Sequence, residues 1–301
     1  MSYYITKILF ILQKIVWRFR YACSTQNINV SPNNISIIVV GRNDNYGGDF
    51  SLRLKTTIDW NLKQLPGAEL IYIEWNKIPE KESDCLWIEE RYPNSKCYTV
   101  SNQVHQSINT NPKMPVMEYF AKNIGIQKAT NDWILMINAD CLIGNDTLKN
   151  IKKLSKKYVY GTHYVSFNWD GLTITNNHLS NKAKYTFAFP AWPTLESVVG
   201  NFTLTHKSNW LQATGYDESL TNVRAGVDAN GLNQLLHLGL KAIVIGHHYH
   251  LDHPESMIHG ANDTHGTHSF KNIPYKNKSN WGFNNVSLKK ISERIWSLEK
   301  I

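Results

Sequence analysis

The sequence lacks the glycine-rich loops with which many enzymes bind nucleotides. No G-x-G-x-x-G follows its first predicted strand and no G-x-x-x-x-G-K-[ST] occurs anywhere, which excludes the usual dinucleotide-binding and P-loop chemistry. Cysteine is also scarce in the 301 residues. Cys23, Cys85, Cys97 and Cys141 form no C-x-x-C and no metal-binding spacing. They indicate reduced thiols in a cytosolic protein, although Cys85 and Cys97 could bridge a loop.

A long hydrophobic run is missing as well. In the N-terminal segment YYITKILFILQKIVWRFRYA, Lys7 and Lys14 leave only Ile8–Leu12 uninterrupted, far short of the roughly 20 apolar residues of a membrane-spanning helix. On a helix, Lys7, Lys14 and Arg18 share one stripe, and apolar side chains cover most of the rest. Residues 1–22 are therefore predicted to form an amphipathic helix, which lies on an anionic membrane surface or docks on its own domain or a partner. The expected location is the cytoplasm or the cytoplasmic face of a membrane.

Acidic residues are fewer than basic ones. The chain has 24 Asp and Glu against 32 Lys and Arg, which gives a net charge of +8. This excess favours anionic partners such as nucleotide phosphates or acidic lipids. Nucleic acid is not an expected partner, because the lysines are scattered and no nucleic-acid-binding module is present. With 42% hydrophobic residues, the chain can form one large domain with extensions.

From residue 35 onward the sequence alternates buried strands with amphipathic helices. Apolar runs at 35–40, 68–75 and 133–137 are typical of strands in a parallel sheet covered on both faces. Helical periodicity fills the segments 52–65 and 116–129. A third helix, capped by Asn145 or Asp146, is predicted to carry Leu148, Ile151, Leu154 and Tyr158. In this β-α-β-α-β layout the strand ends should meet at one edge, where ligands bind: Arg42-Asn43-Asp44, Glu74 and Asn138-Ala139-Asp140.

The segment AKNIGIQKATNDWILMINADCLI carries a resemblance. It is similar to A-[RK]-N-x-G-x-x-x-A-x-[GN]-[DE]-[WY]-[IL], followed by an apolar strand and an acidic triplet, in GT-A-fold glycosyltransferases, most closely the family 2-like enzymes. GRNDNYGGDF, IEWN, GNFTLTHKSNWLQATGYDES and YHLDH, in that order, resemble a bacterial branch of these proteins. The resemblance implies an α/β, Rossmann-like GT-A domain over residues 30–255. Its donor half would span about 30–145 and its acceptor half about 146–255, and residues 256–301 would form a loop or lid and a C-terminal helix.

The resemblance also implies a reaction and its donor site. The reaction is transfer of a sugar from a nucleotide sugar, in the first place a UDP-sugar, to a glycan or a lipid-linked acceptor, assisted by Mn²⁺ or Mg²⁺. Asp140 would hold the cation that bridges the diphosphate. The usual D-x-D is Asn138-Ala139-Asp140 in this chain, so one negative charge is missing. The donor-binding residues would be Arg42, Asn43, Asp44, Glu74, Lys122, Asn123 and Asn138.

Four histidines follow the apolar strand AIVI in the stretch HHYHLDH. Alternate residues of a strand face one side, so His248 and His250 could reach a common metal ion, as could His250 and His253 in a turn. In the related enzymes a histidine after the last core strand completes the metal shell. The resemblance favours His250 for this role, with His253 as the second choice.

The acceptor side is implied by GNFTLTHKSNWLQATGYDESL and VDANGLNQLLHLG. Asp228 matches the general base of an inverting transfer, although the glutamate that precedes it in the family is Val227 here. Asp217 is the rival base, and Asp228 as a helix cap is the structural alternative. Trp192 and Asn201 are further acceptor-side candidates. Residues 254–280 are predicted to be a loop or lid, and VSLKKISERIWSLEK a closing helix.

Two other functions remain open at this point. A nucleotidyltransferase of similar topology should carry a glycine-rich loop after its first strand, and GRNDNYGG lacks that order. A catalytically degenerate GT-A fold that only binds carbohydrate or a partner protein would explain the missing aspartate and the Val227 change. Turnover of a nucleotide sugar separates an enzyme from this binding protein.

Overall fold

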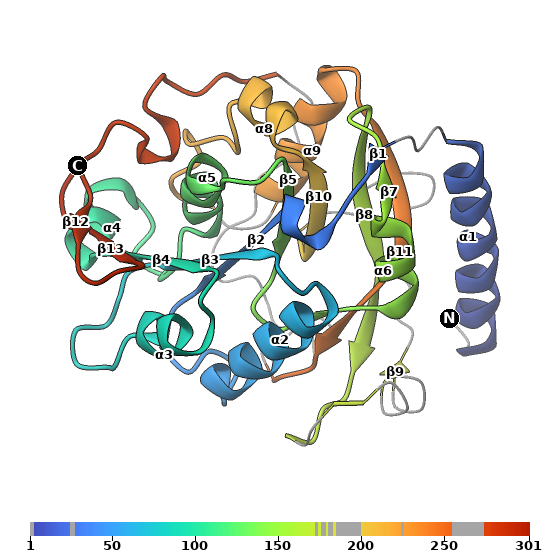
Figure 1. Ribbon diagram of the computed structural model, residues 1–301, viewed down its shortest axis with the longest axis horizontal. Helices are drawn as coiled ribbons and strands as arrows, with labels where there is room; N and C mark the ends of the chain where they lie inside the picture. The colour runs from blue at the N-terminus through green and yellow to red at the C-terminus, as the bar shows by residue number, and fades with distance from the viewer. Residues whose placement is uncertain are drawn as a thin grey trace.

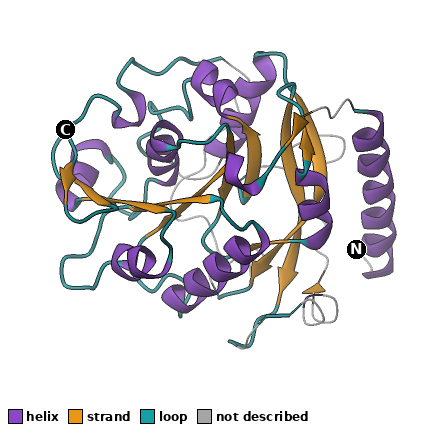
Figure 2. Ribbon diagram, viewed as in Figure 1, coloured by secondary structure: helices purple, strands orange, loops and turns teal. Residues whose placement is uncertain are grey.

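The structure is a computed structural model that describes residues 3–24, 28–171, 174–175, 179, 183–184, 200–223, 226–254 and 274–301 (Figure 1). Within these residues an 11-stranded sheet crosses the molecule, with helices on both of its faces (Figure 2). The strand order is β12-β13-β4-β3-β2-β5-β10-β8-β11-β6, and β9 pairs with β8. This architecture confirms the predicted α/β fold.

The first half of the sheet is parallel and deeply buried. Its strands are β2 (Ile35–Gly41), β3 (Glu69–Glu74), β4 (Ser95–Val100) and β5 (Trp133–Ile137). Every residue of β3 and β5 is buried, as expected for strands covered on both faces. The helices of this half are α2 (Phe50–Gln64), α3 (Asp84–Arg91), α4 (Asn102–Ile108) and α5 (Glu118–Lys128). Side chains alternate between two cores: Leu135 packs in the core with α2 and α3, and Met136 in the core with α4 and α5.

The second half of the sheet has mixed strand directions. β10 (Phe202–His206) runs antiparallel to β5 and to β8 (Tyr158–Phe167), and β11 (Lys241–Leu251) runs parallel to β8. The short β6 (Cys141–Ile143) returns antiparallel to β11, and β9 (Ala183–Lys184) pairs with β8. The remaining elements are α6 (Asn145–Ile151), α8 (Lys207–Ala213), α9 (Val227–His237), the paired β1 (Ile28–Asn29) and β7 (Lys153–Leu154), and 3₁₀ turns at Pro32–Asn34 and Trp281–Phe283.

The N-terminal helix α1 (Tyr3–Cys23) forms an outer layer at the edge of the molecule, beside α6 and β11 (Figure 1). Trp17 is the buried residue of its described side chains, and it packs against Val244 of β11. The side chains of Lys7 and Lys14 lie outside the described residues, so the predicted basic stripe is seen only at Arg18. No helix in the described part of the chain is apolar over a length that could cross a bilayer.

The predicted closing helix at the C-terminus is wrong. The segment forms β12 (Lys289–Lys290) and β13 (Ile295–Leu298) instead, and β13 adds a parallel strand beside β4. Ile295 and Leu298 are buried, and Trp296 stacks on Tyr98 with ring centroids 5.3 Å apart. The edge of β4 offers free backbone hydrogen-bonding groups, and residues 295–298 pair with them as a strand. This pairing with a distant segment outweighs the helical periodicity of the local sequence.

The helix predicted after residue 144 is shorter than expected. It ends at Ile151, and Leu154 and Tyr158 lie in β7 and β8. Leu154 is fully buried where β7 pairs with β1. It is therefore a buried strand residue, and its spacing from Ile151 matches a helical period by coincidence. The cap is Gly144 rather than Asn145 or Asp146, and no side chain caps the helix.

Most of the predicted lid, residues 255–273, lies outside the described residues. Its last part lies against the acceptor half. Gln234 Nε2 of α9 donates to the carbonyl oxygen of Tyr275 at 2.6 Å, and Asn277 Nδ2 donates to the carbonyl oxygen of Thr214 at 2.6 Å. These bonds fix Tyr275 next to α9 and Asn277 next to the end of α8.

Candidate active site

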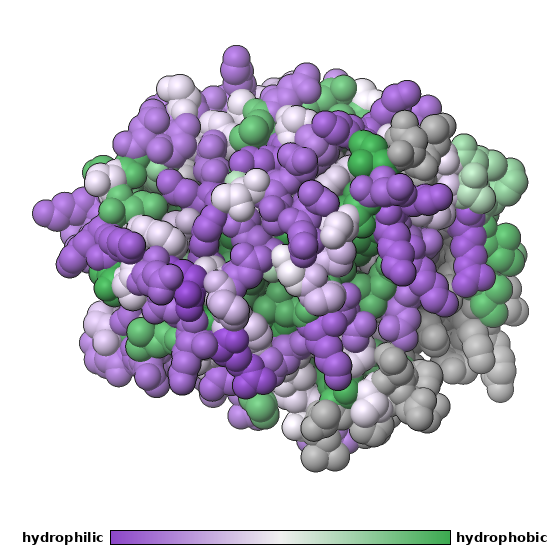
Figure 3. Space-filling model, in the orientation of Figure 1, coloured by the Kyte–Doolittle hydropathy of each residue, from purple (hydrophilic) through white to green (hydrophobic). Residues whose placement is uncertain are grey.

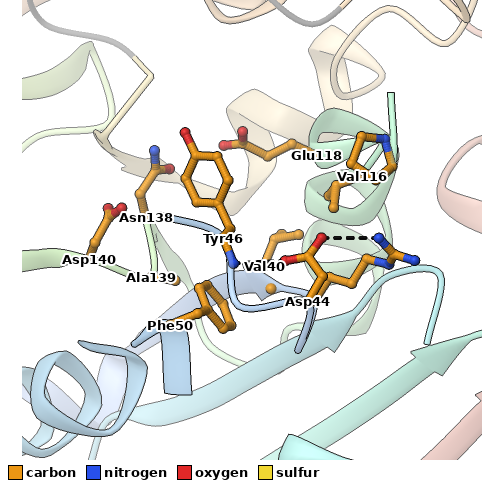
Figure 4. Close-up of a pocket in the computed structure, with 12 residues that line it drawn as sticks. Val40, Asp44, Tyr46, Phe50, Val116, Glu118, Asn138, Ala139 and Asp140 are labelled. Atoms are coloured by element: carbon orange, nitrogen blue, oxygen red, sulfur yellow. Dashed lines mark hydrogen bonds and ion pairs between the residues drawn. The ribbon is translucent and has the colours of Figure 1, made fainter. Parts of the chain in front are cut away.

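A pocket of about 100 Å³ opens at the edge where β2 and β5 end. This is the edge at which open α/β sheets bind ligands. Figure 4 shows Asp140, Asn138 and Glu118 of α5 in that order across the view, with Tyr46 and Asp44 of the loop after β2 also at the pocket. The lining residues are Val40, Gly41, Arg42, Asp44, Tyr46, Phe50, Pro115, Val116, Glu118, Asn138, Ala139 and Asp140.

The loop after β2 is folded by its own charged groups. Arg42 donates to Asp44 at 3.0 Å and to the carbonyl oxygen of Asn76 at 2.9 Å, so two predicted donor residues are held at the pocket wall. Beneath the loop, the buried guanidinium of Arg53 donates to the carbonyl oxygens of Tyr46, Gly47 and Gly48. A fixed loop can contribute binding groups without a large ordering cost.

The strongest cluster of candidate ligands is formed by Asp140, His250 and His253. Asp140 Oδ2 lies 3.4 Å from His250 Nε2 and 3.3 Å from His253 Nε2. Ligand atoms of the three residues all lie within 4.8 Å of one another. The neighbouring strands explain this convergence, because β11 pairs with β6 directly after Asp140, and the Leu251 N–H donates to the Asp140 carbonyl oxygen at 2.8 Å.

The electrostatics of this cluster favour a charged carboxylate. Burial alone would raise the pKa of Asp140, but the two imidazoles hold it well below its usual range. Burial would lower the pKa of His250, yet Asp140 and Asp252 outweigh it and raise that pKa to about 9. Asp252 faces His250 Nδ1 at 3.7 Å and accepts a hydrogen bond from Ser166, which orients the ring from behind.

This donor set fits a divalent transition metal. Two imidazole nitrogens and one carboxylate oxygen suit such an ion better than Mg²⁺, which prefers oxygen ligands. The ring nitrogen of His253 that faces Asp140 is Nε2, and its buried Nδ1 makes no hydrogen bond. The alternative pair of His248 and His250 is not formed among the described residues, since His248 Nδ1 is 2.8 Å from the Thr162 hydroxyl and His248 is absent from the cluster.

Gly47 lets the loop after β2 approach this cluster. Its φ is +62°, a conformation that side chains rarely adopt. A Cβ at this position would lie 2.3 Å from His253 Nδ1. The Tyr46 ring also meets the His253 ring edge-on, with centroids 5.0 Å apart. The loop therefore covers one side of the histidine.

Glu118 is a site residue that sequence reasoning missed. Its carboxylate faces the pocket and pairs with the buried Lys122 at 2.6 Å. The Asn138 side-chain nitrogen donates to Glu118 Oε1 and to the Gly200 carbonyl oxygen, both at 3.1 Å, an orientation that follows because both partners are acceptors. Lys122 Nζ also donates to the Gly200 carbonyl oxygen at 3.1 Å. The i,i+4 spacing of Glu118 and Lys122 indicates a helical ion pair, but it does not reveal that the pair faces the pocket.

Four predicted donor residues do not line this pocket, and one of them, Lys122, reaches it only through its ion pair with Glu118. The Glu74 carboxylate accepts hydrogen bonds from Ser83 and from the Asp84 N–H at the start of α3, and burial raises its pKa. Asn123 is fully buried, and the nitrogen and the oxygen of its side-chain amide both form hydrogen bonds with the turn at 216–218. Asn43 Nδ2 donates to the Glu82 carbonyl oxygen at 3.3 Å. These side chains shape the frame around the pocket.

On the acceptor side, Asn201 lies next to Asn138, and Asp228 lies next to Gly200. Asn201 is hydrogen bonded to the Asn138 side chain at 2.9 Å. Asp228 is the second residue of α9, whose cap is Gly226, and a Cβ at Gly200 would lie 2.5 Å from Asp228 Oδ2. Burial raises the pKa of Asp228, partly offset by its own helix N-terminus and by Lys122. A raised pKa moves a carboxylate toward the range of a general base.

Of the other two acceptor-side candidates, Asp217 does not line the pocket. Asp217 accepts hydrogen bonds from the N–H and hydroxyl of Ser219 at 2.9 and 2.7 Å, as the carboxylate of a local turn does. Trp192 lies outside the described residues.

The protein has the fold of GT-A glycosyltransferases. No protein-family model matches the sequence, and no curated protein matches it either. Among solved structures, GalNAc-T7 with UDP, GalNAc and Mn²⁺ is similar at a TM-score of 0.50 and 15% identity, over 73% of this chain and 43% of that one.

Two further solved structures give lower scores. A mannosyltransferase from Pyrobaculum calidifontis, in complex with GDP-Man and Mn²⁺, has a TM-score of 0.45 at 15% identity, over 78% of this chain and 63% of its own. TarS from S. aureus has a TM-score of 0.42 at 16% identity, over 74% of this chain and 37% of its own. This chain thus spans less than two thirds of the length of each of the three proteins.

Proposed function

We propose that the protein is a metal-assisted glycosyltransferase that moves a sugar from a nucleotide sugar, in the first place a UDP-sugar, to a glycan or lipid-linked acceptor. The observation that carries the proposal is the convergence of Asp140, His250 and His253 beside a pocket at the carboxyl edge of the sheet. Mn²⁺ in the similar structures of GalNAc-T7 and the mannosyltransferase supports the same cofactor here.

In this proposal each part of the pocket has one task. Asp140, His250 and His253 hold the cation, which neutralises the negative charge that develops on the departing diphosphate. The loop carrying Arg42 and Asp44 binds the nucleotide beside the ends of β2 and β5. These groups are fixed before the donor arrives, so little of the binding energy is lost in ordering them.

Asp228 is proposed as the general base of an inverting reaction. Its carboxylate takes the proton of the acceptor hydroxyl while that oxygen forms its bond to the anomeric carbon and the bond to the diphosphate breaks on the opposite face. Lys122 and the α9 N-terminus keep enough of this carboxylate ionised to accept the proton, and burial keeps its pKa raised.

A binding protein with a degenerate active site is the second candidate. It is favoured by Asn138 in place of the first aspartate of D-x-D. Asn138 is also compatible with an active enzyme. It is hydrogen bonded to Glu118, which lines the pocket, so a second carboxylate is present beside position 138.

Thermal unfolding with a panel of nucleotide sugars, with and without Mn²⁺, tests the proposal. A donor at about 100 times its Kd stabilises the protein by roughly 2.7 kcal/mol, which is a shift of several degrees. Asp140→Ala is expected to abolish the Mn²⁺-dependent shift and to lower the unliganded midpoint, because His250 and His253 lose the carboxylate that they contact. Glu293→Gln, a change at an exposed carboxylate, serves as the control. If no nucleotide sugar shifts the midpoint in Mn²⁺, donor binding is excluded, and a shift without turnover favours the degenerate binding protein.

A further inference from the structure

The described side chains of α1 contact the domain through one face of the helix. Trp17 is buried against Val244, and the Tyr21 hydroxyl donates to the carbonyl oxygen of Asn150 at 3.1 Å. The guanidinium of Arg20 lies over the Trp17 ring at 4.8 Å from its centroid. These contacts hold α1 in a defined orientation against α6 and β11.

The face turned away from the domain is apolar. Ile11, Leu12, Ile15 and Phe19 are exposed by 48%, 52%, 57% and 69%. At 3.6 residues per turn these four side chains fall within an arc of about 100° on the helix surface. Figure 3 shows hydrophobic side chains along the edge of the molecule where α1 lies. Four such side chains on one stripe form a binding surface rather than scattered exposed residues.

A cavity of about 300 Å³ lies where α1 meets α6 and β11. Exposed cations border it from both helices, Arg18 from α1 and Lys149 from α6. One carboxylate, that of Asp146, also lines the cavity, but it is held by the His247 imidazole and by the N–H groups of Thr147 at 2.9 Å and His247 at 3.2 Å. Two exposed cations against this one carboxylate leave the balance of charge at the rim positive.

We propose that α1 binds an anionic bilayer, with Ile11, Leu12, Ile15 and Phe19 in the acyl boundary and a lipid phosphate at the rim between Arg18 and Lys149. An in-plane helix buries its apolar face about 5–10 Å into the boundary, which brings cations at its flanks to the level of the phosphates. A phospholipid surface fits both features, because Arg18 adjoins the apolar stripe on α1 and Lys149 of α6 borders the same cavity.

The test is co-sedimentation with phosphatidylcholine vesicles, with and without phosphatidylglycerol. The protein should sediment with the anionic vesicles. Phe19→Ser with Ile15→Ser should weaken binding at least tenfold, because two large apolar side chains lose their burial. Arg18→Gln and Lys149→Gln should each weaken it about fivefold on the anionic vesicles. Leu211→Ser and Lys290→Gln, which change exposed residues far from α1 in the sequence, should leave it unchanged.

Three outcomes would overturn the proposal. Equal sedimentation of the α1 variants and the two controls would remove the role of this face. Release of the protein from phosphatidylglycerol vesicles by inorganic phosphate, with the Phe19 variant unaffected, would make the rim a site for free phosphate. A dimer that becomes a monomer in the Phe19 and Ile15 variant, without vesicle binding, would mean that a second copy covers the stripe. Because neither donor nor acceptor enters the sedimentation assay, the glycosyltransferase proposal is unaffected by any of these results.

Discussion

Restoring an aspartate at position 138 should destabilise the protein, even though it would complete the D-x-D of the related enzymes. The Asn138 nitrogen donates to Glu118 Oε1 and to the Gly200 carbonyl oxygen, each at 3.1 Å. In the Asn138→Asp variant, a carboxylate oxygen in the place of this nitrogen would face two acceptors and share the site with a second carboxylate. Two unit charges at this separation repel by about 5 kcal/mol at an effective dielectric constant of about 20.

Lys122 reduces this penalty, because its buried ammonium lies 2.6 Å from Glu118 Oε1. We therefore expect Asn138→Asp to lower the free energy of unfolding at pH 7 by about 2–3 kcal/mol. The two carboxyls would then share a proton, and one pKa of the folded state would rise above its unfolded value. The folded state would bind more protons than the unfolded state, so the loss of stability should shrink as the pH falls toward 5.

Urea unfolding of four proteins measures this coupling: the parent, Asn138→Asp, Glu118→Gln and the double variant. In the double variant the new amide at position 118 can donate to the new carboxylate at position 138, and Lys122 can pair with that carboxylate. Most of the lost stability should therefore return, and we expect a coupling free energy of at least about 1.5 kcal/mol. If Asn138→Asp is as stable as the parent, or the double variant is no better than the sum of the singles, Glu118 does not determine the residue at 138.

Two further predictions concern the base and the loop over the metal group. Asp228→Asn should lower single-turnover transfer by about 10²–10⁴ with little change in donor affinity, whereas Asp217→Asn should remain near normal; the opposite result would make Asp217 the base. Gly47→Ala should weaken Mn²⁺ binding in calorimetry, because its Cβ would lie 2.3 Å from His253 Nδ1 and would displace the His253 ring. Gly48→Ala is the matched control, since its φ of +71° causes similar backbone strain but its Cβ meets nothing within 4 Å. Equal metal affinity of the two glycine variants would contradict the role of the loop.

Local patterns were sufficient where one segment decides its own structure. The apolar run at 133–137 predicted a strand buried on both faces, and the structure confirms it as β5 with Asp140 just beyond its end. The same patterns failed at 145–158 and at 286–300, where partners far along the chain decide the outcome. Leu154 pairs with Ile28 and Ile295 with Cys97, and neither pairing leaves a trace in the local period.

The candidate site divides in the same way. The sequence alone determined which residues can bind a cation, because carboxylate and imidazole chemistry belongs to Asp140, His250 and His253 wherever they lie. Only the tertiary structure brought them together, since β6 folds back on β11 and sets Cys141 opposite His250 across 109 residues of chain. Glu118 and Lys122 were likewise visible as a helical ion pair, but the packing of α5 against the sheet decided that the Glu118 carboxylate faces the pocket and that Lys122 is buried. Residue type is local information, whereas the distance between two side chains depends on every strand pairing between them.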